Sequence, residues 1–236
     1  SETGKAGNII TVAKIIVIGI FIVAGLVAMI NAEESTVSGK FTPFLPEGFS
    51  GVLVAMGLTF IAFEGYEIIV QAGEEVVEPR RTIPKAVFLS LLIVIPIYVL
   101  VAIVCLGALV IPPDVLASTG WDPGETWRYL AGLGETGVAV AANAFLPWGL
   151  GAMLLVIGAV LSTMSALNAT TFSSTRVSFA MGRDRFLPAA LGKVSSRTRT
   201  PTIALIASGV LIVGVALLLD AEKVASATCA MFLLVF

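Results

Sequence analysis

Long apolar segments follow one another along this chain, separated by short stretches in which prolines, glycines and charged residues collect. An α-helix needs about 20 residues to cross the roughly 30 Å of hydrocarbon in a bilayer. The pattern therefore predicts six membrane-spanning helices, at about residues 9–30, 50–79, 84–111, 147–181, 201–219 and 222–236. The last of these is cut short and the chain starts without methionine, so we expect a piece of a longer protein.

The second apolar segment is interrupted by the letters FEGYE. Glu64 and Glu67 are carboxylates at bilayer depth, where a cavity, a partner or a ligand must compensate the charge. Gly65 lies between them and can adopt backbone angles that continue neither flanking helix. We therefore predict a break near residues 63–66. An unbroken helix would place both acids on one face, whereas a break would aim them differently, and the sequence leaves both geometries open.

A helix broken inside a membrane leaves the last carbonyls of its first half and the first amides of its second half without helical partners. Such groups bind polar ligands. Here the carbonyls belong to the segment around Phe60 to Phe63, and the second half begins near Tyr66. Because the C-terminal end of a helix carries partial negative charge, this segment suits a cation such as an ammonium group.

Composition supports the membrane interpretation, because 57% of the 236 residues are hydrophobic and only 13% are charged. Lysine and arginine collect in the first tail and in every second connection. This distribution predicts that residues 1–8, 74–85 and 182–200 face the cytoplasm. The net charge of -2 offers no basic surface for nucleic acid.

The residue types that the chain lacks narrow its candidate chemistry. It contains no histidine, the commonest general base and zinc ligand. Cys105 and Cys229 both lie in apolar segments, which argues against a disulfide or a metal site and favours packing roles. We therefore expect no metal, no cofactor and no enzyme. A membrane-embedded enzyme that uses Glu64 and Glu67 as acid and base is the competing class of hypothesis.

Polar residues also occur inside or between other apolar segments. Lys14 is the one ionisable residue of the first segment, and its ammonium group is either buried or bent back toward the headgroups. Ser162 lies in a hydroxyl-rich part of the fourth segment, where hydroxyls commonly bond to helix carbonyls or join helices. Pro79 and Pro84 bracket the letters EPRRTIP, which we expect to form a short basic turn.

Three stretches resemble one protein family. The letters FIAFEGYEIIVQAGEEVVEPRRTIPKAVFLSL resemble the sixth helix and following turn of amino acid permeases in the amino acid, polyamine and organocation superfamily. The letters IGAVLSTMSALNATTFSSTRVSFAMGRDRFLP resemble the eighth helix, and VAKIIVIGIFIVAGL resembles the fifth. The resemblance covers the chain from about Thr11 and implies helices five to ten of an all-α integral membrane protein. The implied fold is part of the leucine-transporter-like inverted repeat, with a discontinuous helix at about residues 50–79.

The resemblance also implies roles at the break. Family members bind the amino group of the substrate with carbonyls of the broken helix, and around Gly65 these carbonyls match Phe60, Ile61, Ala62 and Glu64. Aromatic residues that wall or gate the pocket match Phe63 and Tyr66, and an acidic gate residue matches Glu67. Glu64 departs from the family, where this position is often apolar. It either favours a cationic substrate such as lysine, arginine or ornithine, or turns away toward a helix outside this chain. The packing of helix one beside this position favours the second.

In proton-coupled members, a lysine of helix five takes the place of a sodium ion and contacts helix eight. Lys14 and Ser162 match that pair. Burial disfavours the charged form of a lysine, so Lys14 can release and regain a proton. The leading hypothesis is a secondary transporter of amino acids in the cell membrane that works by alternating access and proton symport. Close alternatives are an exchanger and a carrier of cationic amino acids or polyamines, and a receptor that transports nothing is a further class. The expected partners are an amino acid, protons, the lipid bilayer and helices of the same polypeptide outside this chain, with no nucleic acid.

Overall fold

The computed structural model describes residues 2–63, 65–71, 73, 76–146 and 149–235. Their regular secondary structure is helical, and no strand occurs among them. The chain forms two compact units. The first unit comprises residues 1–48 and 93–165, and the second unit comprises residues 49–92 and 166–236.

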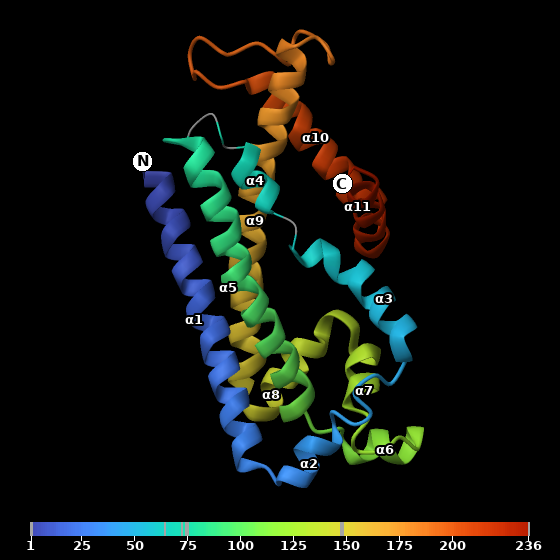
Figure 1. Cartoon of the computed structure of the whole chain (residues 1–236). Helices are drawn as coiled ribbons and strands as arrows, with labels where there is room; N and C mark the ends of the chain where they lie inside the picture. The colour runs from blue at the N-terminus through green and yellow to red at the C-terminus, as the bar shows by residue number, and fades with distance from the viewer. Residues whose placement is uncertain (1, 64, 72, 74–75, 147–148, 236) are drawn as a thin grey trace. The chain divides into compact units, whose positions relative to one another are not determined.

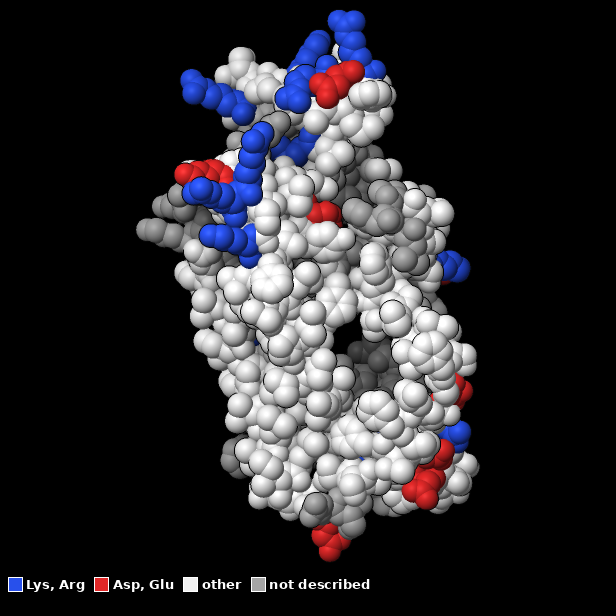
Figure 2. Space-filling view, in the orientation of Figure 1, with Lys and Arg blue, Asp and Glu red and all other residues white. Residues whose placement is uncertain are grey.

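Three helices of the described residues are long and apolar enough to cross a bilayer. They are α1 (Glu2–Asn31), α5 (Pro79–Ala108) and α9 (Leu150–Arg183) (Figure 1). Two shorter helices are also apolar: α3 (Gly48–Thr59), whose apolar part is Gly48–Gly57, and α10 (Thr202–Leu218). Many of their large apolar side chains are exposed, and Figure 2 shows broad uncharged surfaces along the helices. This is the surface that a protein presents to lipid rather than to water.

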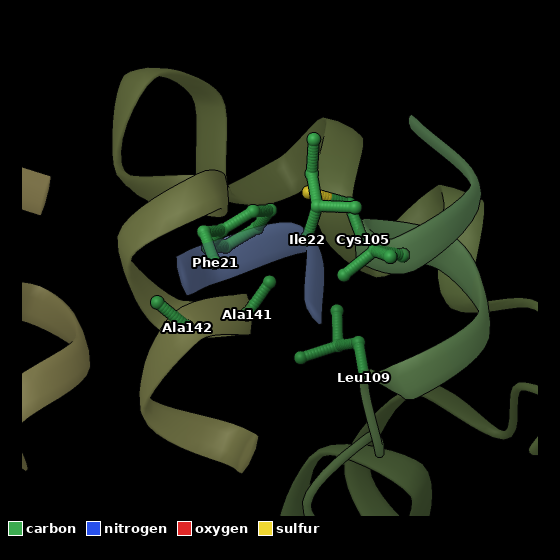
Figure 3. Packing of buried hydrophobic residues seen from close by; sticks show 7 residues of the cluster. Phe21, Ile22, Cys105, Leu109, Ala141 and Ala142 are labelled. Atoms are coloured by element: carbon green, nitrogen blue, oxygen red, sulfur yellow. The ribbon is translucent and has the colours of Figure 1, made fainter. Parts of the chain in front are cut away.

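The first unit has a small core where α1, α5 and α8 (Gly137–Phe145) meet. Figure 3 shows Phe21 and Ile22 of α1 packed with Cys105 and Leu109 near the end of α5 and with the alanines of α8. The ring of Phe21 lies 5.2 Å from that of Phe145 in an edge-to-face arrangement. Cys105 is buried in this core as a free thiol, which is the packing role expected of it.

Glycines allow α1 and α5 to approach closely in the first unit. A Cβ added at Gly25 would overlap the side chain of Val104, and one added at Gly107 would overlap Met29. Small residues at such crossings are how membrane helices gain packing contacts without a hydrophobic driving force between them. The close pairing of these helices therefore depends on glycine at both positions.

A buried lysine in the loop after α1 forms hydrogen bonds with the end of α5. Lys40 follows the short helix α2 (Glu34–Gly39), and only 7% of its surface is exposed. Its Nζ donates hydrogen bonds to the carbonyl oxygens of Gly107, at 2.9 Å, and Leu109, at 2.7 Å. These carbonyls lie where α5 ends and leaves its last acceptors without helical partners. Burial lowers the pKa of Lys40 from its ordinary value of 10.5.

Short helices connect α5 to α9 in the first unit. They are α6 (Pro113–Thr119), α7 (Thr126–Leu133), the single 3₁₀ turn η3 (Gly134–Thr136) and α8. The Thr126 hydroxyl donates to the carbonyl of Leu106 at 3.2 Å, so α7 also satisfies an acceptor at the end of α5. The predicted fourth span begins at about residue 147, and α8 precedes it as a helix that the sequence analysis does not assign.

The second unit contains α3, the 3₁₀ turn η1 (Phe60–Phe63), α4 (Tyr66–Gln71), the first half of α5, the last half of α9, α10 and α11 (Ala221–Val235). The ring of Phe60 lies 6.5 Å from that of Phe232 on α11. The hydroxyls of Ser178 on α9 and Ser208 on α10 are 3.3 Å apart. These contacts join α11 to η1 and α10 to α9.

Two expectations about the segment before α5 are wrong. The predicted second half of the broken helix ends at Gln71, and residues 76–78 form bends instead of continuing to 79. The letters EPRRTIP do not form a turn, because α5 begins at Pro79 and runs through Pro84. Proline suits the first position of a helix, where its missing N–H has no partner to lose. The amides of Arg81 and Thr82 both donate to the carbonyl of Glu78 at 3.0 Å, which starts the helix.

Candidate functional site

The candidate substrate site is the interruption between α3 and α4. The α-helix α3 ends at Thr59, the chain makes one 3₁₀ turn over Phe60–Phe63, and α4 starts at Tyr66. Gly65 has a φ of +115°, in a region that residues with a side chain rarely adopt. A Cβ at Gly65 would meet nothing within 4 Å, so the backbone angle, and not space, calls for glycine. An uninterrupted helix here would have removed the basis for a ligand site.

The second half of the interruption is capped by its own acid. The Gly65 N–H donates to Oε2 of Glu67 at 2.8 Å, and the Ile68 N–H donates to the carbonyl of Gly65 at 3.2 Å. A carboxylate is favoured at a helix N-terminus because it neutralises the partial positive charge of the first amides. Glu67 is half-buried, and its local partner in the structure is this backbone amide.

The other residues predicted for the substrate site lie in the same short stretch. Phe60, Phe63, Gly65 and Tyr66 are half-buried, whereas Ala62 is exposed. The backbone of Ile61 belongs to η1, and its side chain is not described. Glu64 lies outside the described residues. The end of α3 and the turn η1 present peptide carbonyls at the negative end of the helix dipole, where a substrate ammonium group would be favoured.

The two residues predicted for proton coupling line one cavity of the first unit. This cavity has a volume of about 500 Å³ and lies between α1, α8 and α9. Lys14 is half-buried on its α1 wall and Ser162 is exposed on its α9 wall. A Cβ added at Gly158 would lie 3.0 Å from Val17, so this glycine sets how closely the two walls approach.

Most of the cavity wall is apolar. The hydroxyl of Thr136, at the start of α8, is a third polar group in the lining, and it donates to the carbonyl of Leu133 at 2.8 Å. Within the described part of the chain, the structure records no hydrogen bond or ion pair for Lys14 and none between it and Ser162. Thr136 is absent from the sequence-based prediction, because it lies in a polar connection and carries no signal in the chain that points to Lys14.

No group of three or more histidine, cysteine, aspartate or glutamate residues that could hold a metal ion occurs among the residues that the structure describes. Among the described residues, the interruption and the cavity offer backbone carbonyls and amides, the ammonium group of Lys14, hydroxyls and the carboxylate of Glu67. They can bind a charged amphiphile and exchange a proton, but they do not form a nucleophile and base pair.

Helices of this length and hydropathy, with apolar side chains turned outward, define an integral membrane protein. The family follows from comparison with known proteins: the model of the amino acid permease family matches residues 1–236. The chain therefore belongs to the amino acid permease family. This confirms the resemblance stated from the sequence.

Individual proteins are also similar to most of this chain. The uncharacterized protein MJ0609 of Methanocaldococcus jannaschii is 33% identical over 99% of this chain and 48% of its own length. The branched-chain amino acid permease BcaP of Bacillus subtilis is 32% identical over 86% of this chain and 38% of its own length. The cationic amino acid transporter 4 of Mus musculus is 29% identical over 89% of this chain and 29% of its own length.

The chain thus spans less than half the length of these curated relatives. Two of them bear permease or transporter names, in agreement with the expectation that the protein is not an enzyme. No solved structure matches the chain significantly.

Proposed function

We propose that this chain forms part of a secondary transporter that carries amino acids across the cell membrane by alternating access, with proton coupling through Lys14. The observation that carries the proposal is the interruption at Gly65, where helix α3 stops, the backbone takes a φ of +115° and α4 restarts. The proposed architecture is the corresponding part of the leucine-transporter-like inverted repeat.

The interruption suits the ammonium group of an amino acid. The last carbonyls of α3 and the carbonyls of η1 carry partial negative charge, whereas the amide of Gly65 already donates to Glu67. The C-terminal end of the first segment therefore favours a cation, whereas the N-terminal end of the second segment already binds the carboxylate of Glu67. The half-buried rings of Phe63 and Tyr66 stand on either side of Gly65 in the chain and would cover a bound substrate.

Proton coupling is assigned to the cavity that Lys14 shares with Ser162. Lys14, Ser162 and Thr136 contribute to the lining of one cavity, and most of the remaining wall is apolar. Protonation of Lys14 is therefore the step that would link substrate movement to a pH gradient.

A carrier of cationic amino acids or an exchanger is the second candidate function. It is favoured by the name of one relative, the mouse cationic amino acid transporter 4, and by the acidic residue Glu64 beside the interruption. The Bacillus subtilis relative is named for branched-chain amino acids instead. Because the two names refer to different substrates, both neutral and cationic amino acids should be tested.

We assign residues 1–8, 74–85 and 182–200 to the cytoplasmic side. The support is the distribution of charge: lysine and arginine side chains gather where α5 begins and around the end of α9 (Figure 2). Positively charged residues are retained on the cytoplasmic side of a membrane.

The test is uptake of labelled amino acids by the full-length protein in proteoliposomes. The panel contains leucine, valine, alanine, lysine, arginine and ornithine, each with and without an inward proton gradient. The expected result is saturable uptake of at least one amino acid that the gradient accelerates. Uptake that depends on an amino acid inside the vesicle, and not on the gradient, would indicate exchange. No uptake of any member by a monodisperse, folded protein would refute the transport proposal.

A further inference from the structure

The second unit holds a cavity that the proposed transport mechanism does not use. Its volume is about 510 Å³, and it lies where α4, the first residue of α5 and the last two turns of α9 meet. Its lining includes Gln71 of α4, Pro79 of α5, and Arg176, Phe179 and Arg183 of α9. The combination of arginine side chains with apolar surface suits an amphiphile that carries an anionic group.

The arginines of the cavity are arranged on one side of α9. They are seven residues apart, which is two helical turns, so both project from the same face of the helix. The guanidinium of Arg176 lies 5.0 Å from the ring centre of Phe172, and that of Arg183 lies 5.9 Å from the ring centre of Phe179. A guanidinium carries its five N–H donors in a planar fork, the geometry that binds phosphate oxygens in pairs.

Nearby charges increase the attraction for an anion. Basic residues of the same unit follow the lining residues in the chain. Arg80 and Arg81 come directly after Pro79, and the segment after α9 contains Arg185, Lys193, Arg197 and Arg199. Described acids close in sequence to the lining residues are Glu67 on α4, Glu78 before Pro79 and Asp184 after Arg183, and the acids at positions 74 and 75 lie outside the described residues. Asp184 contacts Nε of Arg183 at 3.3 Å, with about half of each side chain exposed, so water weakens this pair.

The cavity lies close in the chain to the point where the apolar part of α5 begins. The apolar part of α5 begins at Ala86, seven residues after Pro79, which corresponds to about 10 Å along the helix. The polar headgroup layer on each side of a bilayer is somewhat thinner, between about 5 and 8 Å, so this position would lie at its outer boundary. A group bound beside Pro79 would therefore lie close to lipid phosphates as well as to the aqueous phase.

We propose that this cavity binds a phosphate group, supplied by an anionic phospholipid headgroup or by a soluble phosphate ester. Arg176 and Arg183 are its charged ligands, and the amide of Gln71 is an additional donor on the opposite wall. A bound phosphate would bridge α9 to α4, the helix that restarts after Gly65. The proposal concerns binding alone and does not depend on the transport proposal.

The experiment measures binding to the full-length protein in detergent by native mass spectrometry and by calorimetry. The lipid probe is phosphatidylglycerol, which has a net negative charge, and the comparison lipid is phosphatidylcholine, whose phosphate is balanced by a choline ammonium group. The soluble probe is glycerol 1-phosphate. The test variant is R176Q/R183Q. The matched control is R197Q/R199Q, which removes the same charge from the loop after α9, outside the cavity lining. Thermal unfolding and size-exclusion chromatography establish that each variant is folded.

The expected result is saturable binding that R176Q/R183Q weakens about tenfold or more, whereas R197Q/R199Q changes it by less than about threefold. Tighter binding of phosphatidylglycerol would identify a lipid site, and tighter binding of glycerol 1-phosphate a soluble ligand. R176K/R183K keeps the charge but loses the forked geometry, so it should bind with intermediate affinity. Failure to detect saturable binding of either probe, or equal weakening by both double glutamine variants, would overturn the proposal.

Discussion

Replacement of Gly65 by alanine tests whether the interrupted backbone is required. The φ of +115° is strained for any residue with a Cβ, and nothing within 4 Å would touch the added methyl group. The whole cost is therefore a backbone cost, which is about 1–3 kcal/mol for a residue held in a sparsely populated region. If this strain falls only on the interrupted conformation, the population that binds substrate decreases by about 5- to 150-fold.

The assay compares the initial rate of amino acid uptake in proteoliposomes with thermal unfolding in detergent. Gly57→Ala is the matched control, because Gly57 lies inside α3, has no left-handed φ and also has open space around its Cβ. Alanine within a helix is favoured over glycine by about 0.5–1 kcal/mol, so the control should be neutral or slightly stabilising. Both substitutions add one methyl group, but Gly65→Ala should lower the stability and Gly57→Ala should leave it unchanged or raise it.

Gly65→Asn provides a further comparison, because asparagine tolerates a positive φ better than alanine does. We expect it to retain more uptake than Gly65→Ala. If Gly65→Ala transports and unfolds like Gly57→Ala, the backbone at this position does not need the left-handed conformation, and the argument built on the interruption is wrong.

Three other substitutions test neighbouring parts of the reasoning. Lys14→Ala should abolish the acceleration of uptake by a proton gradient, whereas Lys5→Ala, in the same helix, should not; an unchanged pH response would remove Lys14 from the coupling mechanism. Lys40→Met should lower stability by about 2 kcal/mol at neutral pH, because the carbonyls of Gly107 and Leu109 lose a charged donor. Since burial lowers the pKa of Lys40, the native state holds fewer protons than the unfolded state between that lowered pKa and 10.5. The cost of burying the charge therefore disappears as pH rises through this range, so the stability difference between the wild type and Lys40→Met should increase. A difference that decreases with rising pH would contradict a lowered pKa for Lys40. Glu67→Ala should cost about 1 kcal/mol in thermal unfolding through loss of the bond from the Gly65 amide, and Glu67→Gln, which keeps an acceptor oxygen, should cost less.

Properties that depend on neighbouring residues could be predicted from the sequence. The apolar segments predict long helices because hydropathy and helix length are local, and α1, α5 and α9 are such helices. Gly65 between two acids indicates a change of backbone direction, because only glycine is free to adopt the angles required. The membrane class and the permease family also follow from the letters alone.

The ends of helices were predicted less well, because competing local preferences have similar energies. EPRRTIP contains two prolines and suggests a turn, yet proline is equally suited to the first turn of a helix, and α5 begins at Pro79. The apolar residues before position 147 likewise gave no predicted helix of their own, although they form α8, whose Asn143 accepts a hydrogen bond from the amide of Ala152 on α9.

Contacts between residues distant in the chain were decided by the tertiary structure. The sequence by itself determined that Lys14 lies in an apolar segment, and the family resemblance paired it with Ser162. Only the packing of α1, α8 and α9 encloses both in one cavity and adds Thr136 to its wall. In the same way Lys40 looks like an ordinary loop lysine until the end of α5 is placed beside it. The physical reason is that hydropathy and backbone preference act over a few residues, whereas burial and the partner of a polar group are set by which helices pack together.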